Sequence, residues 1–379
     1  MSDGPLLRVE NLRVSFDTED GVVHAVDGVS YEVETGKTLG IVGESGSGKT
    51  VSSLTTLGLT RFQGAEITGS IYFGGRDLVQ LDDDDMRRLR GNDIAMIFQD
   101  PLSSLHPFFK VGNQLVEAIR THQDVSKSAA RDRAVDLLEL VGIPDPHRRV
   151  DQYPHEFSGG MRQRAMIAMA LANEPKLLIA DEPTTALDVT VQAQILALLQ
   201  DLQDRLGMAI IIITHDLGVV AEITDEIGVM YAGRIVERAS TKQIFDAPEH
   251  PYTWGLLKSI PALDRSRDED LVPIQGRPPS LILRPSGCFF HPRCPYATKR
   301  SRTTDPRLAP VADDSKHLVA CTLESTVRRQ IWHGLQAGRD PSSLRQLAEP
   351  GLGSRRPAVA STAPAGGTSE TLSSETEET

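Results

Sequence analysis

The chain alternates between short apolar runs and helical patterns up to about residue 230. The apolar runs lie at 38–42, 94–98, 177–180, 210–213 and 227–230. Runs of this length, separated by helices, are typical of strands buried on both faces of a parallel sheet. The pattern therefore predicts an α/β fold with a mainly parallel core sheet.

The clearest helix follows Asp188. Its apolar residues recur at helical spacing and stop before Gly207, a residue type that commonly ends helices. We expect this helix to pack one face on the sheet. The apolar positions are Ile195, Leu198, Leu199, Leu202 and Leu206.

The region between Gln99 and Ser158 has no convincing strand. Helical patterns run over about 111–120 and 128–141, and Pro and Gly separate them from the flanking strands. We interpret residues of about 100–157 as a helical subdomain inserted into a larger domain that spans 1–260.

The composition changes after about Ala239. Pro-rich, interrupted sequence predicts a small C-terminal domain over 261–345. The stretch 346–379 consists mainly of Gly, Ala, Ser, Thr and Glu, so it has too few large apolar side chains to offset the entropy of ordering. We expect this tail to be disordered.

Charge and hydropathy exclude several classes of function. Lys and Arg number 40 and Asp and Glu 52, a net charge of −12, which argues against a nucleic-acid partner gripped by the whole chain. No apolar run approaches a membrane span, and the first residues lack a hydrophobic signal core, so the expectation is a cytosolic protein. The acidic run 82–85 predicts a solvated turn or helix start rather than a metal site, because consecutive carboxylates do not point at one centre.

The segment Gly43–Thr50, with the sequence GESGSGKT, follows the strand at 38–42 and precedes a helical stretch. Glycines in this pattern let backbone N–H groups curl around phosphate oxygens, the lysine reaches the terminal phosphates, and the threonine hydroxyl can bind Mg²⁺. The residues expected to bind nucleotide here are Gly43, Ser45, Gly46, Gly48, Lys49 and Thr50.

Two carboxylates end the apolar strand at 177–180. Asp181 is placed to hold Mg²⁺ through water, and Glu182 is the candidate general base for the attacking water. A strand that merely ends in solvated acids is the alternative, although the nearby phosphate loop argues against it.

Two further sites lie at element ends. Ser158, Gly159 and Gly160 open a helix and present free N–H groups to an anion, although ordinary helix capping explains them equally well on residue type alone. His215 closes the strand at 210–213, where a neutral imidazole could hydrogen-bond a γ-phosphate; a purely structural histidine is the alternative.

In their order along the chain, these motifs resemble those of the ATP-binding cassette (ABC) family over about residues 6–260. The resemblance implies a P-loop cassette with an antiparallel N-terminal β part. It assigns Ser158 and its glycines to the signature loop, with Phe157 replacing the usual leucine, and Asp188 to the D-loop. It also implies that Gln99 contacts Mg²⁺ and senses the γ-phosphate, and that Phe16 stacks on adenine, where a core position is the alternative.

The family pairs two cassettes head to tail, so that ATP held by Lys49 of one subunit is covered by Ser158 and Gly160 of the other. This chain contains one set of motifs. The resemblance therefore implies a second cassette subunit, identical or paralogous, with closure on ATP binding and reopening after hydrolysis at Glu182.

Longer matches, such as FQDPLSSLHP and HPYTWGLLKSIP, are similar to the ATPase subunits of oligopeptide, dipeptide and nickel importers. That likeness implies two membrane permeases, an extracytoplasmic solute-binding protein, and a place at the cytoplasmic face of the membrane. His106 departs from the usual Asn in a region that the permeases contact. Nickel or another solute, a non-transport cassette ATPase and a small-molecule kinase are the alternatives. A kinase would leave the signature loop and His215 unexplained.

All three cysteines, Cys288, Cys294 and Cys321, lie in one late segment and form no disulfide framework. The segment resembles the C-terminal domain of this subfamily, which commonly carries four cysteines that can hold an iron–sulfur cluster. The third cysteine of that set falls at Ser301 here. Ser301, His291 or His317 could complete a site for a 4Fe–4S cluster or Zn²⁺; plain buried thiols are the alternative.

Overall fold

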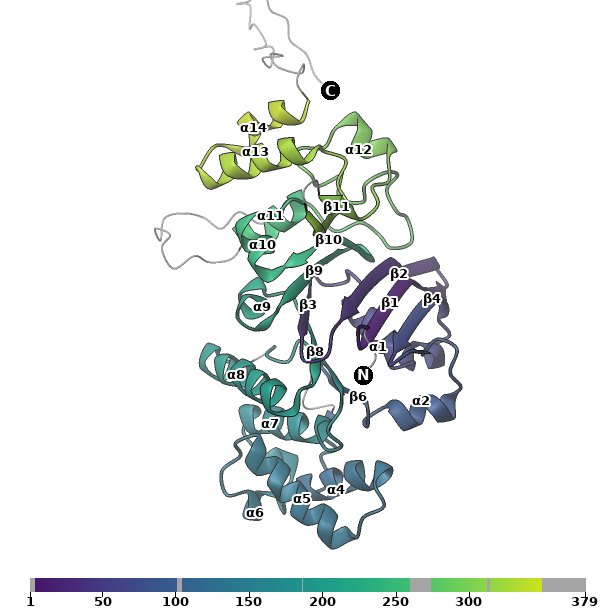
Figure 1. The fold of residues 1–379 in the computed structure, drawn as a ribbon, viewed down its shortest axis with the longest axis vertical. Coiled ribbons are helices and arrows are strands. Elements are labelled where there is room, and N and C mark those ends of the chain that lie inside the picture. The colour runs from purple at the N-terminus through teal and green to yellow at the C-terminus, as the bar shows by residue number, and fades with distance from the viewer. Residues whose placement is uncertain (1–3, 101–103, 186, 260–273, 312–313, 350–379) are drawn as a thin grey trace, which may run out of the picture.

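The computed structural model describes residues 4–100, 104–185, 187–259, 274–311 and 314–349. Figure 1 shows an elongated molecule with two sheets at its centre. A helical subdomain lies at one end, and the C-terminal helices lie at the other.

The larger sheet contains the five predicted strands as neighbours. They run parallel in the order β9-β3-β8-β7-β6. The mainly parallel core is thus confirmed. The strands are β3 (Thr38–Val42), β6 (Ile94–Ile97), β7 (Leu177–Asp181), β8 (Ala209–Thr214) and β9 (Glu226–Tyr231).

Both faces of this parallel core are buried. Along β8, Ile211 and Ile213 pack in one apolar cluster, whereas Ile210 and Ile212 pack in the other. Successive residues of a strand point to opposite faces, so a continuous apolar run is what a doubly covered strand requires.

The antiparallel N-terminal sheet covers one face. Its order is β2-β1-β4-β5, as the family resemblance implied. Leu7 and Val9 of this sheet share an apolar cluster with Leu39 and Ile41 of β3. The strands are β1 (Leu7–Thr18), β2 (Gly21–Val33), β4 (Glu66–Phe73) and β5 (Arg76–Asp77).

Helices connect these sheets. The acidic run begins a helix, as predicted, because the Asp82 carboxylate accepts a hydrogen bond of 2.8 Å from the backbone N–H of Asp85. The predicted helix after Asp188 runs over 189–206 and buries Ile195, Leu199 and Leu202, although Leu206 is exposed. The elements are α1 (Lys49–Thr56), η1 (Leu59–Gln63), α2 (Asp83–Leu89), α8 (Val189–Leu206) and α9 (Leu217–Ile223).

Among the described residues between Gln99 and Ser158, the elements are all helical. They form the lower lobe in Figure 1 together with the helix that follows Ser158. Their bounds are α4 (Val111–His122), α5 (Lys127–Leu140), α6 (Pro146–Arg149), η2 (Pro154–Glu156) and α7 (Gly159–Ala170).

The C-terminal part adds three antiparallel strands to the large sheet, in the order β11-β12-β10 next to β9. These are β10 (Arg234–Ser240), β11 (Ala309–Val311) and β12 (Asp314–Val319). The helices are α10 (Thr241–Asp246), α11 (Pro251–Lys258), α12 (Lys299–Thr303), α13 (Ser325–Gln336) and α14 (Pro341–Ala348). Helix α14 passes the expected domain end at 345, and residues 350–379 of the expected disordered tail lie outside the described residues.

Candidate nucleotide-binding and hydrolysis site

The phosphate loop joins β3 to α1 and needs glycine at two of its positions. Gly43 and Gly48 have φ of 155° and 99°. A Cβ on Gly43 would lie 2.1 Å from the carbonyl oxygen of Met230, and one on Gly48 would lie 2.2 Å from that of Ala25. The loop therefore packs directly on neighbouring backbone, which leaves its N–H groups free to face phosphate oxygens.

Lys49 points back into the loop. Its Nζ atom donates to the carbonyl oxygens of Gly43, at 2.7 Å, and Glu44, at 3.0 Å. Burial lowers the pKa of Lys49, and the nearby carboxylates of Glu182 and Asp181 oppose that shift. The lysine is thus held at the loop, where the terminal phosphates of a nucleotide would lie.

Asp181 ends β7 and is almost fully buried, with an exposed fraction of 2%. Burial raises its pKa, and a hydrogen bond from Thr50 opposes that shift. The Oδ1 atom of Asp181 is buried without a hydrogen-bond partner. A carboxylate oxygen left in this state beside a hydroxyl suits a hard cation such as Mg²⁺, so Thr50 and Asp181 fit the predicted metal role.

Three side chains contact the carboxylate of Glu182. Its Oε2 atom accepts from Nε2 of Gln99 at 3.0 Å and from the Thr185 hydroxyl at 2.8 Å, while its Oε1 atom lies 3.1 Å from Nδ1 of His215. Burial acts to raise the pKa of Glu182, but the hydrogen bonds from Thr185 and His215 outweigh it and lower the pKa. The carboxylate is therefore ionised, as a general base must be.

These residues come together because the carboxyl ends of β6, β7 and β8 meet at one edge of the sheet. Gln99 follows β6, Glu182 follows β7 and His215 follows β8. The structure thus brings the three residues predicted to be catalytic into contact, next to the phosphate loop that precedes α1.

Ser158 caps α7, and its hydroxyl accepts from the backbone N–H of Met161 at 3.3 Å. Ser158 and Gly159 are exposed, whereas Phe157 is buried on the packing side. Asp188 caps α8 in the same way, through Val191. A Cβ on Gly160 would lie 3.1 Å from a methyl of Val191, so the signature loop and the start of α8 are neighbours.

Phe16 lies on β1 opposite Val23 of β2. Its ring is partly buried and packs against the apolar cluster under the N-terminal sheet. Adenine stacking by this ring stays a prediction.

Sequence reasoning missed one contact of the phosphate loop. The carboxylate of Glu44 pairs with the guanidinium of Arg293, at 2.5 Å and 2.9 Å. Both residues lie in segments already recognised, the phosphate loop and the cysteine segment, but no sequence pattern connects them.

The iron–sulfur hypothesis finds no support in the structure. The three thiols are half-buried, and desolvation raises the pKa of each, that of Cys321 to about 11. Among the described residues, no group of three or more His, Cys, Asp or Glu side chains has the arrangement of a metal site.

The proposed fourth ligands are already engaged. The Ser301 hydroxyl accepts from the backbone N–H of Thr298 at 2.7 Å and donates to its carbonyl oxygen at 3.0 Å, which caps α12. His291 Nδ1 lies 3.0 Å from the Cys288 carbonyl oxygen, and His317 Nε2 lies 2.8 Å from Glu237. Among the described residues, the three thiols and these groups are therefore not arranged as a cluster site.

Comparison with known proteins agrees with this geometry. The family model described as "ABC transporter" matches residues 26–185, and that described as "Oligopeptide/dipeptide transporter, C-terminal region" matches residues 236–300. A dimeric ATP-binding cassette bound to ADP and phosphate superposes with a TM-score of 0.55 at 26% identity, over 62% of this chain and 98% of that one. The cassette cbiO1 of Clostridium perfringens gives 0.55 at 29% identity, over 65% and 92%.

Fold and site together define an ABC-type ATPase. Two curated relatives show to which group of ABC ATPases this chain belongs. The oligopeptide transport ATP-binding protein OppD of Bacillus subtilis is 54% identical over 81% of this chain and 86% of its own length. The dipeptide transport ATP-binding protein DppD of Escherichia coli is 52% identical over 81% and 94%. The chain belongs to this family of oligopeptide and dipeptide ABC transporter ATP-binding subunits.

Proposed function

We propose that this chain hydrolyses ATP to power the import of oligopeptides or dipeptides across the cytoplasmic membrane. The observation that carries the proposal is the contact of Glu182 with Gln99 and His215 beside the phosphate loop. The two relatives, an oligopeptide and a dipeptide transport ATP-binding protein, supply the substrate class. Nickel or another solute handled by the same subfamily, and a non-transport ATPase, are the competing functions.

Different residues of the site have different roles in the reaction. The loop N–H groups and Lys49 bind the phosphates, while Thr50, Asp181 and Gln99 would hold Mg²⁺, which neutralises charge on the phosphates when bound. The Glu182 carboxylate accepts a proton from the attacking water. His215 and Gln99 hold that carboxylate in place through the contacts of 3.1 Å and 3.0 Å.

Hydrolysis requires a second cassette in this proposal. Ser158 and Gly159 are exposed at the start of α7, which is the arrangement needed to cover ATP on another subunit. An isologous pair of such cassettes buries two nucleotides, each between Lys49 of one subunit and the signature loop of the other. The partner is a second copy of this chain or a paralogue.

A groove for the permeases lies between β6 and the helical subdomain. A cavity of about 660 Å³ there is lined largely by apolar side chains, among them Met96, Phe98 and Met166. Phe108 and Phe109, a few positions after the lining residue Ser104 in the chain, have exposed fractions of 82% and 54%, and the His106 ring lies 4.6 Å from that of Phe109. An apolar groove and exposed aromatic side chains suit the insertion of a short permease helix.

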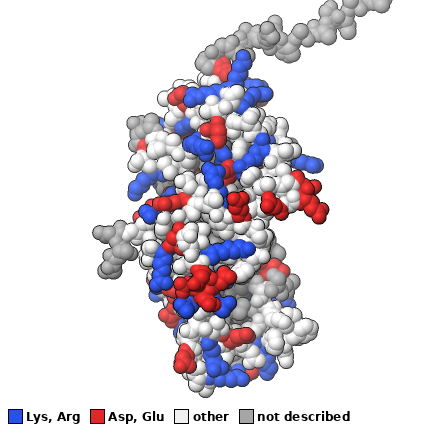
Figure 2. Space-filling model, turned by 90° about the vertical axis from the view of Figure 1, so that its right-hand side faces the viewer, with Lys and Arg blue, Asp and Glu red and all other residues white. Residues whose placement is uncertain are grey.

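The expected location is the cytoplasmic face of the membrane, with an extracytoplasmic solute-binding protein as part of the complex. Within the part of the chain that the structure describes, no helix is long and apolar enough to cross a bilayer. On the face shown in Figure 2, acidic and basic side chains are interspersed, so this face offers no continuous basic surface to nucleic acid.

Affinity purification of the Glu182→Gln chain from detergent-solubilised native membranes, with ATP and Mg²⁺, tests the assembly. We expect two multi-span permeases, with or without a second cassette subunit, to be identified by mass spectrometry. Recovery of soluble partners, ribosomes or DNA alone would refute the transport function and leave the ATPase chemistry intact.

The substrate is tested on the recovered complex. Reconstituted into vesicles, it should hydrolyse ATP faster when its solute-binding protein is loaded with a dipeptide or an oligopeptide. Stimulation by Ni²⁺ and not by peptide would replace the peptide assignment with the nickel alternative.

A further inference from the structure

The phosphate loop is tied by a side-chain pair to the C-terminal segment. Both carboxylate oxygens of Glu44 accept from the guanidinium of Arg293, at 2.5 Å and 2.9 Å. The Arg293 side chain is 4% exposed and that of Glu44 is 29% exposed. A bidentate pair of this kind fixes orientation as well as distance.

The backbone of Glu44 is held from the same direction. Its N–H donates to the hydroxyl of Tyr252 at 2.8 Å, and its carbonyl oxygen accepts from Lys49 at 3.0 Å. Tyr252 is fully buried in α11. Glu44, which bonds to the phosphate-binding lysine, is thus held by Arg293 and Tyr252, two residues from outside the phosphate loop.

Arg293 is itself preorganised. It donates to the carbonyl oxygens of Gln275 at 3.0 Å and Ile274 at 3.2 Å, and it lies beside the rings of Tyr231 and Phe290. The turn that carries Arg293 starts at Cys288, whose carbonyl oxygen accepts from the backbone N–H of His291. The guanidinium is therefore presented to the loop with little freedom to move away.

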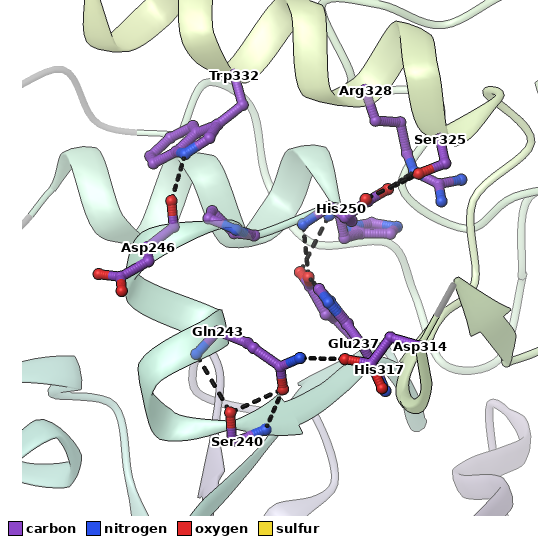
Figure 3. Close-up of polar contacts among 12 residues, drawn as sticks. Glu237, Ser240, Gln243, Asp246, His250, Asp314, His317, Ser325, Arg328 and Trp332 are labelled. Carbon is purple, nitrogen blue, oxygen red and sulfur yellow. Dashed lines mark hydrogen bonds and ion pairs between the residues drawn. The ribbon is translucent and has the colours of Figure 1, made fainter. Parts of the chain in front are cut away.

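Tyr252 has an equally firm support, part of which lies around Glu237, His250 and Arg328 in Figure 3. The buried carboxylate of Glu237 accepts from the backbone N–H groups of Glu249 and His250, at 2.6 Å and 3.0 Å. His250 then caps α11 through its contact of 3.1 Å with the Tyr252 N–H. Arg328 of α13 holds the Glu249 carboxylate at 2.7 Å. The C-terminal helices thereby fix the start of α11.

Glu44 is an anion in a loop built to bind anions. Its charge is close enough to act on the ammonium of Lys49. Without a counter-ion, the same charge would repel the phosphates of ATP. The positive charge of Arg293 removes that repulsion. Its two hydrogen bonds to Glu44 also align the loop.

We propose that Arg293 is a positioning residue for ATP binding, through which the C-terminal segment sets the nucleotide affinity of the phosphate loop. The inference rests on the ATP site of the proposed function. It adds a dependence of that site on a residue far away in the sequence, and it acts on binding rather than on the chemical step at Glu182.

Four full-length chains test it: wild type, Arg293→Gln, Glu44→Gln and the double variant. Affinity is measured by equilibrium binding of a fluorescent ATP analogue with Mg²⁺. Arg293→Gln leaves an uncompensated carboxylate at the loop, so we expect the Kd to rise about tenfold, an effect that falls at high salt. Glu44→Gln removes the charge but keeps an oxygen that can accept from Arg293, so it should weaken binding far less than Arg293→Gln does, and the double variant should recover most of the lost affinity.

Hydrolysis gives a second readout. Arg293→Gln should raise the KM for ATP about as much as the Kd and leave kcat within about twofold, because the general base is untouched. A purely structural role predicts a lowered melting temperature without rescue by Glu44→Gln. Unchanged affinity in Arg293→Gln, or a double variant as weak as that single variant, overturns the proposal.

Lys49→Ala is the control that separates this inference from the function itself. Failure of the wild-type chain to bind the analogue, or equal binding by Lys49→Ala, would remove the ATP site altogether. Normal binding by the wild type without any coupling between positions 44 and 293 would remove only the inference. Should Arg293→Gln fail to fold, the comparison of Arg293→Met with Arg293→Met/Glu44→Gln keeps the same test, since methionine also leaves the Glu44 carboxylate without a counter-ion.

Discussion

The Nδ1 atom of His215 lies 3.1 Å from the Oε1 atom of Glu182, and the other oxygen of that carboxylate accepts from Gln99 and Thr185. The base is therefore oriented from both sides by side chains of its own chain. This arrangement makes its chemical role open to direct test.

Glu182→Gln should keep ATP affinity and lower phosphate release by about 10²–10⁴-fold, because the amide cannot accept the proton of the attacking water. Phosphate release and equilibrium binding of the analogue measure the two effects separately. Glu222→Gln, an exposed change of the same type on α9, is the matched control and should leave both unchanged. Near-normal hydrolysis by Glu182→Gln would remove Glu182 as the base.

Ser158→Arg should abolish hydrolysis while Lys49 still binds nucleotide, because a large side chain at this exposed cap blocks the covering of ATP by the second cassette. Mixing Ser158→Arg with Lys49→Ala then distinguishes the arrangements. If two copies of this chain share each site, the mixture recovers up to about a quarter of the wild-type rate, since half of the dimers are mixed and each retains one intact site. Unchanged turnover by Ser158→Arg alone would refute a site shared between subunits.

Phe108→Asp should weaken association with the permeases and leave the ATPase activity of the isolated chain unchanged. The ring is 82% exposed, so the substitution removes apolar contact area without disturbing the core. Leu283→Asp, at 80% exposure in the C-terminal part, is the control. Co-purification with the permeases measures the effect, and equal recovery of permeases by both variants would contradict the proposed docking region.

The stability of the fold should fall in acid through His250. Burial, followed by the charge of Arg328, lowers the pKa of this histidine from 6.5 to about 3. Between these values the unfolded chain binds a proton that the folded chain does not, so the contribution of His250 is complete above pH 6.5 and is lost as the pH falls toward 3.

His250→Asn removes this titration and keeps a side-chain oxygen that can cap α11. The free energy of unfolding, from urea titrations at pH 7, 6 and 5, should therefore fall less steeply in the variant. The expected difference approaches about 1.4 kcal/mol per pH unit well below pH 6.5. Parallel pH dependences for the two chains would show that His250 binds its proton equally well in the folded and the unfolded chain.

The core strands could be predicted because each one is apolar along its length, as Ile210–Ile213 shows. The strands β11 and β12 could not. The segment Asp314–Val319 has a mixed polar sequence, and its pairing with β10 rests on the partners Glu237 and Arg238, which lie far away in the chain. Long-range pairing of a short polar strand leaves little signal in local periodicity.

In the ATP site, too, some residues could be predicted from the sequence and others could not. The roles of Gly43–Thr50, Asp181 and Glu182 could be predicted because these residues are adjacent in sequence and their chemistry requires that spacing. Ser301 was a candidate metal ligand on resemblance alone, but its hydroxyl is engaged in a helix cap. The pair of Glu44 with Arg293 spans 249 positions, and nothing in either local sequence specifies the other partner.

That separation also sets an order of events during synthesis. Gly43–Thr50, Ser158 and His215 have already been synthesised and have left the ribosome when Arg293 is added to the chain. Until that arginine emerges and docks, the nascent protein carries an unneutralised carboxylate at its phosphate loop. If Arg293 sets the affinity of the loop as proposed, we expect unfinished chains to lack full affinity for ATP, and with it nucleotide-driven pairing with another cassette.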